Sequence, residues 1–184
     1  MNDHKLSQEL QEAVTHKIFD IPYADQSPSQ ILDIWYPDEE QEKYPVVIHF
    51  HGGGFCVGGH REDSLEPMLK ALDHGYALVS VEYRKSGEAR FPAMVYDAKA
   101  AIRFLKENAK KYKLDPEKIA LWGPSSGGWL VSITALTEGN PAFEDLSMGY
   151  ENENTKVQAV VDWCRPCGYF DEMDQQFKES GKGT

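Results

Sequence analysis

The 184-residue sequence predicts an α/β protein built on a mostly parallel sheet with helices on both faces. From residue 44 onward, apolar runs alternate with amphipathic segments in the order strand, helix, strand, helix, strand, helix, strand. The run at 44–50 contains a continuous apolar stretch, which is typical of a strand buried on both faces, and 76–83 is predicted to be another buried strand. We expect a single domain over 1–184, with an N-terminal helix in 1–15 and the sheet and its helices in 16–184.

Each element follows from its local pattern. Leu6, Leu10 and Val14 are spaced by four residues, which fits a short amphipathic helix. Glycine and proline clusters bound the strands, and Gly75 is placed to end a helix. The expected strands are 16–24, 30–37, 44–50, 76–83, 118–123 and 157–163, and the expected helices are 6–14, 64–75, 92–114 and 127–139.

The helix expected at 92–114 has the clearest pattern. Its apolar positions, beginning Val95, Ala98 and Ile102, step by three and four residues and form one stripe. Its basic residues, including Lys99 and Arg103, fall mostly on the other side. One face of this helix is therefore expected to pack on the sheet.

Charge and cysteine content narrow the class of protein. The net charge is −11 and the pI is about 5.0, so nucleic acid and anionic membranes are unfavourable partners. No apolar run approaches the roughly 20 residues of a membrane span. Cys56, Cys164 and Cys167 are too few for a disulfide scaffold, and we expect a cytoplasmic protein. The spacing of Cys164 and Cys167 also occurs in redox pairs and half zinc sites, but incidental thiols are the favoured interpretation.

A glycine cluster, "GPSSGG", lies between an expected strand and an expected helix. It matches G-x-S-x-G with Gly123, Ser125 and Gly127, the pattern of a nucleophile on a strained strand-to-helix turn. Ser126 lacks a glycine two positions before it, so Ser125 is the predicted nucleophile. A plain glycine-rich turn is the alternative.

A second cluster, Gly52-Gly53-Gly54, follows the strand at 44–50. Attack of a serine on an ester creates an oxyanion, which backbone N–H groups must face. Glycines let the chain come close without obstruction, so we predict the N–H groups of Gly53, Gly54 and Ser126 as donors. A phosphate-binding loop is disfavoured because no lysine follows within eight residues.

The sequence resembles the bacterial hormone-sensitive-lipase-like esterases of the α/β-hydrolase fold. The resemblance covers about residues 30 to 165 and rests on "HGGGF", "VEYR", "FPA" and "LDPEKIALWGPSSGG". It implies a three-layer αβα sandwich, an oxyanion loop at His51 to Gly54 and Ser125 as nucleophile. His51 and Gly52 would support the loop. It also implies short acyl or acetyl ester substrates, including those on carbohydrates, with no metal or organic cofactor.

The partners of such a serine are missing from this chain. The resemblance implies an acid and then a histidine after the nucleophile, but no histidine follows Ser125. Asp162 comes too early for the acid, and neither Asp171 nor Asp174 follows a recognisable further strand. We therefore expect a chain that lacks C-terminal strands, has weak or no esterase activity, and exposes a sheet edge that favours homo-oligomers.

Two other functions stay open from the sequence. A peptidase of the same fold would use a similar serine turn. A catalytically inactive assembly or binding protein would account for the absence of a later histidine. A thiol-redox protein is a more distant alternative, based on Cys164 and Cys167.

Overall fold

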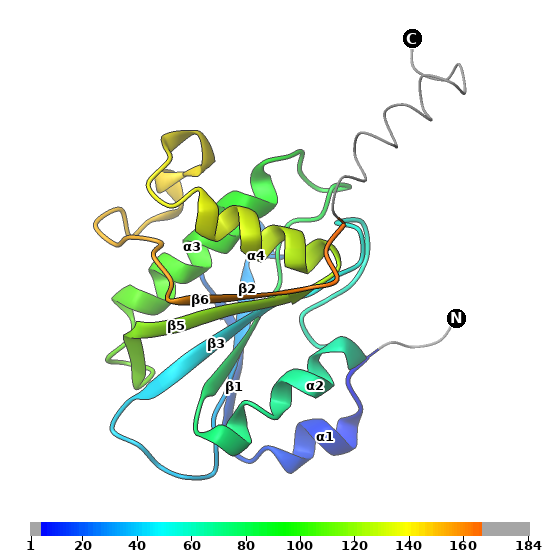
Figure 1. Cartoon of the computed structure of the whole chain (residues 1–184), viewed down its shortest axis with the longest axis vertical. Helices are drawn as coiled ribbons and strands as arrows, with labels where there is room; N and C mark the ends of the chain where they lie inside the picture. The colour runs from blue at the N-terminus through cyan, green and yellow to red at the C-terminus, as the bar shows by residue number, and fades with distance from the viewer. Residues whose placement is uncertain (1–4, 167–184) are drawn as a thin grey trace.

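The computed structural model describes residues 5–166, which form a six-stranded sheet with helices on both faces (Figure 1). The strand order is β1-β2-β4-β3-β5-β6. Strands β4, β3, β5 and β6 are parallel, while β2 runs antiparallel to both β1 and β4. The predicted mostly parallel α/β architecture is confirmed. The strands are β1 (Lys17–Pro22), β2 (Ile31–Trp35), β3 (Tyr44–Phe50), β4 (Ala77–Val81), β5 (Leu114–Pro124) and β6 (Ala159–Trp163).

The two longer helices cover one face of the sheet and the two shorter helices cover the other (Figure 1). Figure 1 shows α3 and α4 together on one face and α1 and α2 on the other. The α-helices are α1 (Gln8–Ala13), α2 (Glu66–Leu69), α3 (Ala93–Glu107) and α4 (Ser126–Leu136). Short 3₁₀ turns complete the description: η1 (Asp63–Leu65), η2 (Leu72–His74), η3 (Pro141–Phe143) and η4 (Leu146–Met148).

All four predicted helices are longer than the observed ones, and two of them differ most. The helix expected at 64–75 is divided into η1, α2 and η2. Pro67 occupies the start of α2, where its missing N–H is harmless, although it cannot continue a helix that began earlier. The helix expected at 92–114 ends at Glu107, and the chain turns into β5 at Leu114. Gly75 ends η2 in a left-handed conformation, as predicted.

The main core lies between the sheet and the pair α3 and α4. Val95, Ala98 and Ile102 of α3 are fully buried and pack with β3, β4 and β5 in one cluster. Val95 and Ile102 each contribute roughly 1.5–3 kcal/mol by leaving water. The predicted apolar stripe of α3 is therefore confirmed. A smaller cluster around Trp35 and Leu65 lies under α1 and α2.

Lys99 and Arg103 are buried, although they lie on the predicted polar side of α3. The loop that follows α4 folds over them and supplies Glu144 as a partner to both. The carboxylate of Glu144 forms ion pairs with Lys99 Nζ at 2.9 Å and with Arg103 Nη1 at 2.6 Å. A helical repeat cannot reveal this covering loop, because the loop comes from elsewhere in the sequence.

Strand β6 forms one edge of the sheet and is exposed along its whole length, Trp163 included.

The helices within residues 5–166 are all too short or too polar to cross a bilayer. Cys167, Asp171 and Asp174 lie outside the described residues.

Candidate active site

Ser125 lies on the turn between β5 and α4, with an exposed side chain. Its backbone has φ 52° and ψ −123°, a combination that non-glycine residues rarely adopt. Such a conformation costs roughly 1–3 kcal/mol and persists only where neighbouring structure holds it. Part of that support is the hydrogen bond from the Ser125 N–H to the carbonyl oxygen of Trp163, at 2.8 Å. The geometry is that of a strained nucleophile turn at the carboxyl edge of the sheet.

The glycines that flank Ser125 are required by close packing. A Cβ on Gly123 would lie 2.4 Å from the backbone oxygen of Gly127, at the start of α4. A Cβ on Gly127 would lie 2.1 Å from the carbonyl oxygen of Phe50, at the end of β3. Both distances are far shorter than the non-bonded contacts that Cβ atoms make in proteins. These two glycines therefore let α4 start directly against the ends of β5 and β3.

The triple-glycine segment lies beside the serine turn. A Cβ on Gly52 would be 3.4 Å from Ser125 Cβ and 3.2 Å from the carbonyl oxygen of Pro124. Gly53 and Gly54 have φ values of 105° and 62°, which only glycine adopts readily. The backbone of Gly52 thus lies next to the Ser125 side chain without an intervening side chain.

The N–H of Gly54 already has a partner within the site. It donates a hydrogen bond of 2.9 Å to Ser126 Oγ, and the Ser126 side chain is buried. This bond competes with the oxyanion role predicted for Gly54. The N–H of Ser126 is at the first position of α4, where no intrahelical acceptor exists and the helix dipole favours negative charge.

His51 lies buried beneath the glycine loop rather than beside the nucleophile. Its Nδ1 is 2.7 Å from the carbonyl oxygen of Gly52, and its Nε2 is 3.3 Å from Glu82 Oε1. The ring stacks on Tyr83 with 4.4 Å between centroids. Both nitrogens are therefore directed at oxygens that hold the loop, and neither is directed at Ser125.

No general base contacts Ser125 within residues 5–166, where its hydroxyl forms no hydrogen bond. Asp162 of β6 accepts from Ser132 Oγ at 2.9 Å and pairs with Arg165 at 2.7 Å. Its carboxylate is thus engaged between α4 and the end of β6. The described part of the candidate site therefore contains Ser125, the predicted nucleophile, and no proton acceptor for its hydroxyl.

One group of three potential metal ligands occurs in the described part of the chain, formed by Asp20, Asp33 and His60. The guanidinium of Arg61 bonds the carboxylates of both Asp33 and Asp20. These carboxylates therefore already face a fixed positive charge, so the donor set does not fit a metal ion.

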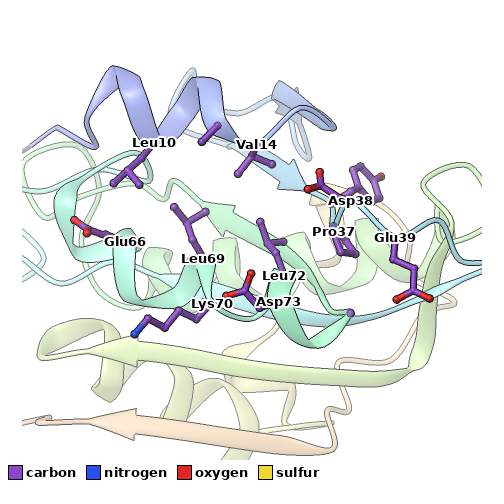
Figure 2. A pocket seen from close by; sticks show the side chains of 13 residues that line it. Leu10, Val14, Pro37, Asp38, Glu39, Glu66, Leu69, Lys70, Leu72 and Asp73 are labelled. Carbon is purple, nitrogen blue, oxygen red and sulfur yellow. The ribbon is translucent and has the colours of Figure 1, made fainter.

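A groove of about 510 Å³ lies between α1 and the segment that contains α2 and η2. In Figure 2, Leu10 and Val14 of α1 point toward Leu69 and Leu72 across it. Acidic side chains, including Glu66 and Asp73, occupy its rim. None of its lining residues comes from the glycine loop or the serine turn, so the groove is separate from the candidate active site.

Sequence reasoning missed Glu82, which contacts the glycine loop at several points. The available signal was its place directly after the buried strand β4, at the edge of the sheet where Ser125 also lies. Arg84 of the same segment pairs with buried Asp97 at 2.8 Å, which is a structural ion pair.

Comparison with known proteins finds a matching family model and relatives that are named as esterases. The BD-FAE family model matches residues 32–183. Esterase LipQ of Mycobacterium tuberculosis is 35% identical over 144 residues, which are 77% of this chain and 34% of that protein. Carboxylesterase NlhH of the same species is 36% identical over 104 residues, 55% of this chain and 32% of that protein. The chain thus spans about a third of the length of these curated relatives.

Solved structures agree with the sequence relatives. A bifunctional GH43-CE protein of Bacteroides eggerthii superposes with a TM-score of 0.74 at 38% identity, over 82% of this chain and 21% of that one. A protein described as a truncated form of carbohydrate esterase from gut microbiota has a TM-score of 0.75 at 31% identity, over 88% and 60% of the two chains. The chain belongs to the BD-FAE family, and it is related to the bacterial hormone-sensitive-lipase-like esterases of the α/β-hydrolase fold.

Proposed function

We propose that this chain provides the nucleophile and the oxyanion-binding half of a serine carboxylic ester hydrolase. The observation that carries the proposal is the strained Ser125 beside the backbone of Gly52. In the reaction, Ser125 Oγ bonds to the ester carbonyl carbon, and the carbonyl electron pair moves to the oxygen. The oxyanion electron pair then re-forms the carbonyl as the bond to the alcohol oxygen breaks, and the alcohol leaves with the proton that Ser125 lost. Water hydrolyses the acyl-enzyme to the free acid and restores the serine hydroxyl.

The developing oxyanion needs donors that are fixed before reaction. We propose the N–H groups of Gly53 and Ser126 as the principal pair. The Gly54 N–H, also predicted as a donor, is held by Ser126 Oγ and must exchange that partner to serve the oxyanion. Each donor is worth about 3–4 kcal/mol of transition-state stabilisation.

The 184-residue chain is expected to be a weak esterase. A serine hydroxyl is a poor nucleophile at neutral pH without an adjacent base, and no described histidine supplies one. Oxyanion donors and substrate binding alone leave roughly 10³–10⁴-fold acceleration over water. Slow acylation of Ser125 is therefore the activity to look for.

Short-chain esters, including acetyl esters on carbohydrates, are the proposed substrates. The support is the similarity to a carbohydrate esterase at 31% identity and to a bifunctional GH43-CE protein at 38%. Trp129 lies one helical turn after Ser125, and its ring is 5.6 Å from that of Phe55 and 6.0 Å from that of Phe91. We propose that these three rings form an apolar wall near the serine. An apolar wall suits an uncharged ester better than the charged amino terminus of a peptide.

A fluorophosphonate probe tests the proposal directly, because it reacts with activated serines. We expect slow labelling that intact-mass analysis and peptide mapping locate at Ser125, and no labelling in Ser125→Ala. Absence of labelling in the wild-type chain would favour an inactive assembly or binding protein. Faster turnover of aminoacyl-peptide substrates than of p-nitrophenyl acetate would favour the peptidase.

A cytoplasmic location is part of the same proposal. Its support is that Cys56 and Cys164, the described cysteines, are both free thiols, as is usual in reducing compartments. Alkylation of both thiols in protein taken directly from cells would test it.

A further inference from the structure

Glu82 follows β4 and lies under the glycine loop that runs from His51 to His60. Its carboxylate contacts both ends of that loop. At the first end, Glu82 Oε1 lies 3.3 Å from His51 Nε2. At the second end, Glu82 Oε2 accepts the backbone N–H of His60 at 3.2 Å and lies 3.1 Å from His60 Nδ1. One side chain therefore closes the loop across its base.

The residues after Glu82 hold the same loop at further points. Tyr83 donates from its hydroxyl to the carbonyl oxygen of His51 at 2.9 Å and stacks on the His51 ring. The N–H of Ser86 donates to the carbonyl oxygen of Phe55 at 2.8 Å. The segment 82–86 thus contacts the start, the middle and the end of the loop.

The charge of Glu82 is suited to this arrangement. Burial opposes its ionisation, but hydrogen bonds from His51 and His60, together with Lys85 Nζ at 2.5 Å, outweigh burial and hold the pKa of Glu82 well below its usual range. The carboxylate is ionised at neutral pH and faces donors on several sides. A neutral side chain of the same shape could not accept all of these hydrogen bonds.

Space around the loop leaves few other conformations. A Cβ on Gly58 would lie 2.6 Å from His51 Nδ1, and a Cβ on Gly59 would lie 3.3 Å from Glu82 Oε2. The second arm of the loop is therefore packed directly on His51 and Glu82. A shift of either side chain would be transmitted to the backbone between them, which includes Gly53.

We propose that Glu82 is a positioning residue that fixes the glycine loop in the conformation that presents the Gly53 N–H to the oxyanion. The proposal rests on the proposed ester-hydrolase function. Glu82 acts through the loop and does not contact Ser125. Loss of its charge leaves the nucleophile intact but lets the loop move, so transition-state stabilisation falls more than ground-state binding.

The first experiment measures the loop without requiring activity. Glu82→Gln keeps the side-chain size and removes the charge. Glu144→Gln is the matched control, because Glu144 is similarly buried (14% exposed side chain, against 12% for Glu82) and pairs with Lys99 and Arg103, as Glu82 pairs with Lys85. By hydrogen–deuterium exchange, we expect the N–H groups of Gly54, Cys56 and Val57 to exchange about tenfold faster in Glu82→Gln only.

Two outcomes of this experiment would overturn the proposal. Unchanged exchange in the loop would show that Glu82 does not hold it. Equal acceleration in the central strands β3 and β5 would show a general loss of stability instead of a local role. Should Glu82→Gln fail to fold, His60→Asn removes only the ring contact with Glu82 at the second end, and faster exchange is then expected at Cys56 and Val57 with β3 unchanged.

The second experiment measures the reaction. In fluorophosphonate labelling of Ser125, we expect Glu82→Gln to lower the maximal rate constant about tenfold while the half-saturating probe concentration stays constant. An unchanged rate constant with a looser loop would refute the link to the oxyanion. If the wild-type chain does not label, the ester-hydrolase function itself fails, and the exchange experiment alone decides whether Glu82 holds the loop.

Discussion

The N–H of Gly54 and the Oγ of Ser126 are joined by a hydrogen bond of 2.9 Å, which ties the glycine loop to the first residue of α4. The second serine of "GPSSGG" therefore contributes its side chain to the loop, in addition to the N–H group predicted from sequence. The Ser126 hydroxyl and the oxyanion are alternative partners for the Gly54 N–H.

Ser126→Ala separates these two roles. If the bond orders the loop, the variant should lower the rate constant for labelling of Ser125 about tenfold, with a loss of about 1 kcal/mol in the free energy of unfolding. Labelling that becomes faster in Ser126→Ala would mean that the freed Gly54 N–H serves the oxyanion better, and that the hydroxyl restrains the site.

Gly127→Ala should be among the most damaging small substitutions in this protein. Its Cβ would lie 2.1 Å from the carbonyl oxygen of Phe50, so α4 must separate from β3, and we expect a loss of about 3 kcal/mol or more. Gly87→Ala is the matched control, since nothing lies within 4 Å of its Cβ and its φ is not positive. Urea denaturation measures both, and equal stabilities of the two variants would contradict the packing described for the serine turn.

Acidification between pH 7 and pH 5 should destabilise the fold through His49. Burial first, and then the neighbouring His51 and His60, lower the pKa of His49 from 6.5 to about 3. Its ring nitrogens have no hydrogen-bond partner among residues 5–166. The unfolded chain binds a proton below pH 6.5 that the folded chain refuses, so stability falls as the pH falls, by about 2 kcal/mol at pH 5.

His49→Gln removes this titration, so the difference in unfolding free energy between pH 7 and pH 5 should shrink by that amount. The lowered pKa of Glu82 affects stability in a lower pH range. Its contribution to the free energy of unfolding is lost only as the pH falls below 4.5, the value for the unfolded chain. If the free energy of unfolding depended on pH identically in wild type and His49→Gln, protonation of His49 would not be the cause of the acid destabilisation.

The exposed edge strand β6 is expected to promote self-association of the 184-residue chain. Its five residues are all exposed, and its outer backbone groups have no strand beside them within the described residues. Val161→Lys places a charge on this strand and should shift sedimentation toward the monomer. Val57→Lys is a control with an exposed side chain outside the sheet. A wild-type chain that sediments as a monomer at all concentrations would remove the basis for this expectation.

The sequence predicted the fold well because its signals are local. Continuous apolar runs marked the parallel strands, and the stripe of Val95, Ala98 and Ile102 marked the buried face of α3. The glycines beside Ser125 were predictable for the same reason, since a tight turn requires them wherever it occurs.

Contacts that join distant segments could not be predicted in this way. Nothing near Lys99 in the sequence indicates that Glu144 will cover it, and nothing near His60 indicates that Glu82 will bind its ring. Likewise, the bond between Gly54 and Ser126 depends on how two loops meet in space. Such contacts decide how the site is held, and they become visible only in three dimensions.

The hydrogen bond from the Ser125 N–H to Trp163 gives the peripheral strand a mechanical connection to the reactive hydroxyl. Because that bond is part of what holds the unusual backbone angles of Ser125, displacement of β6 would remove support from the serine turn. A strand that joined the exposed edge, or a force that peeled β6 away, would therefore act on the backbone of Ser125.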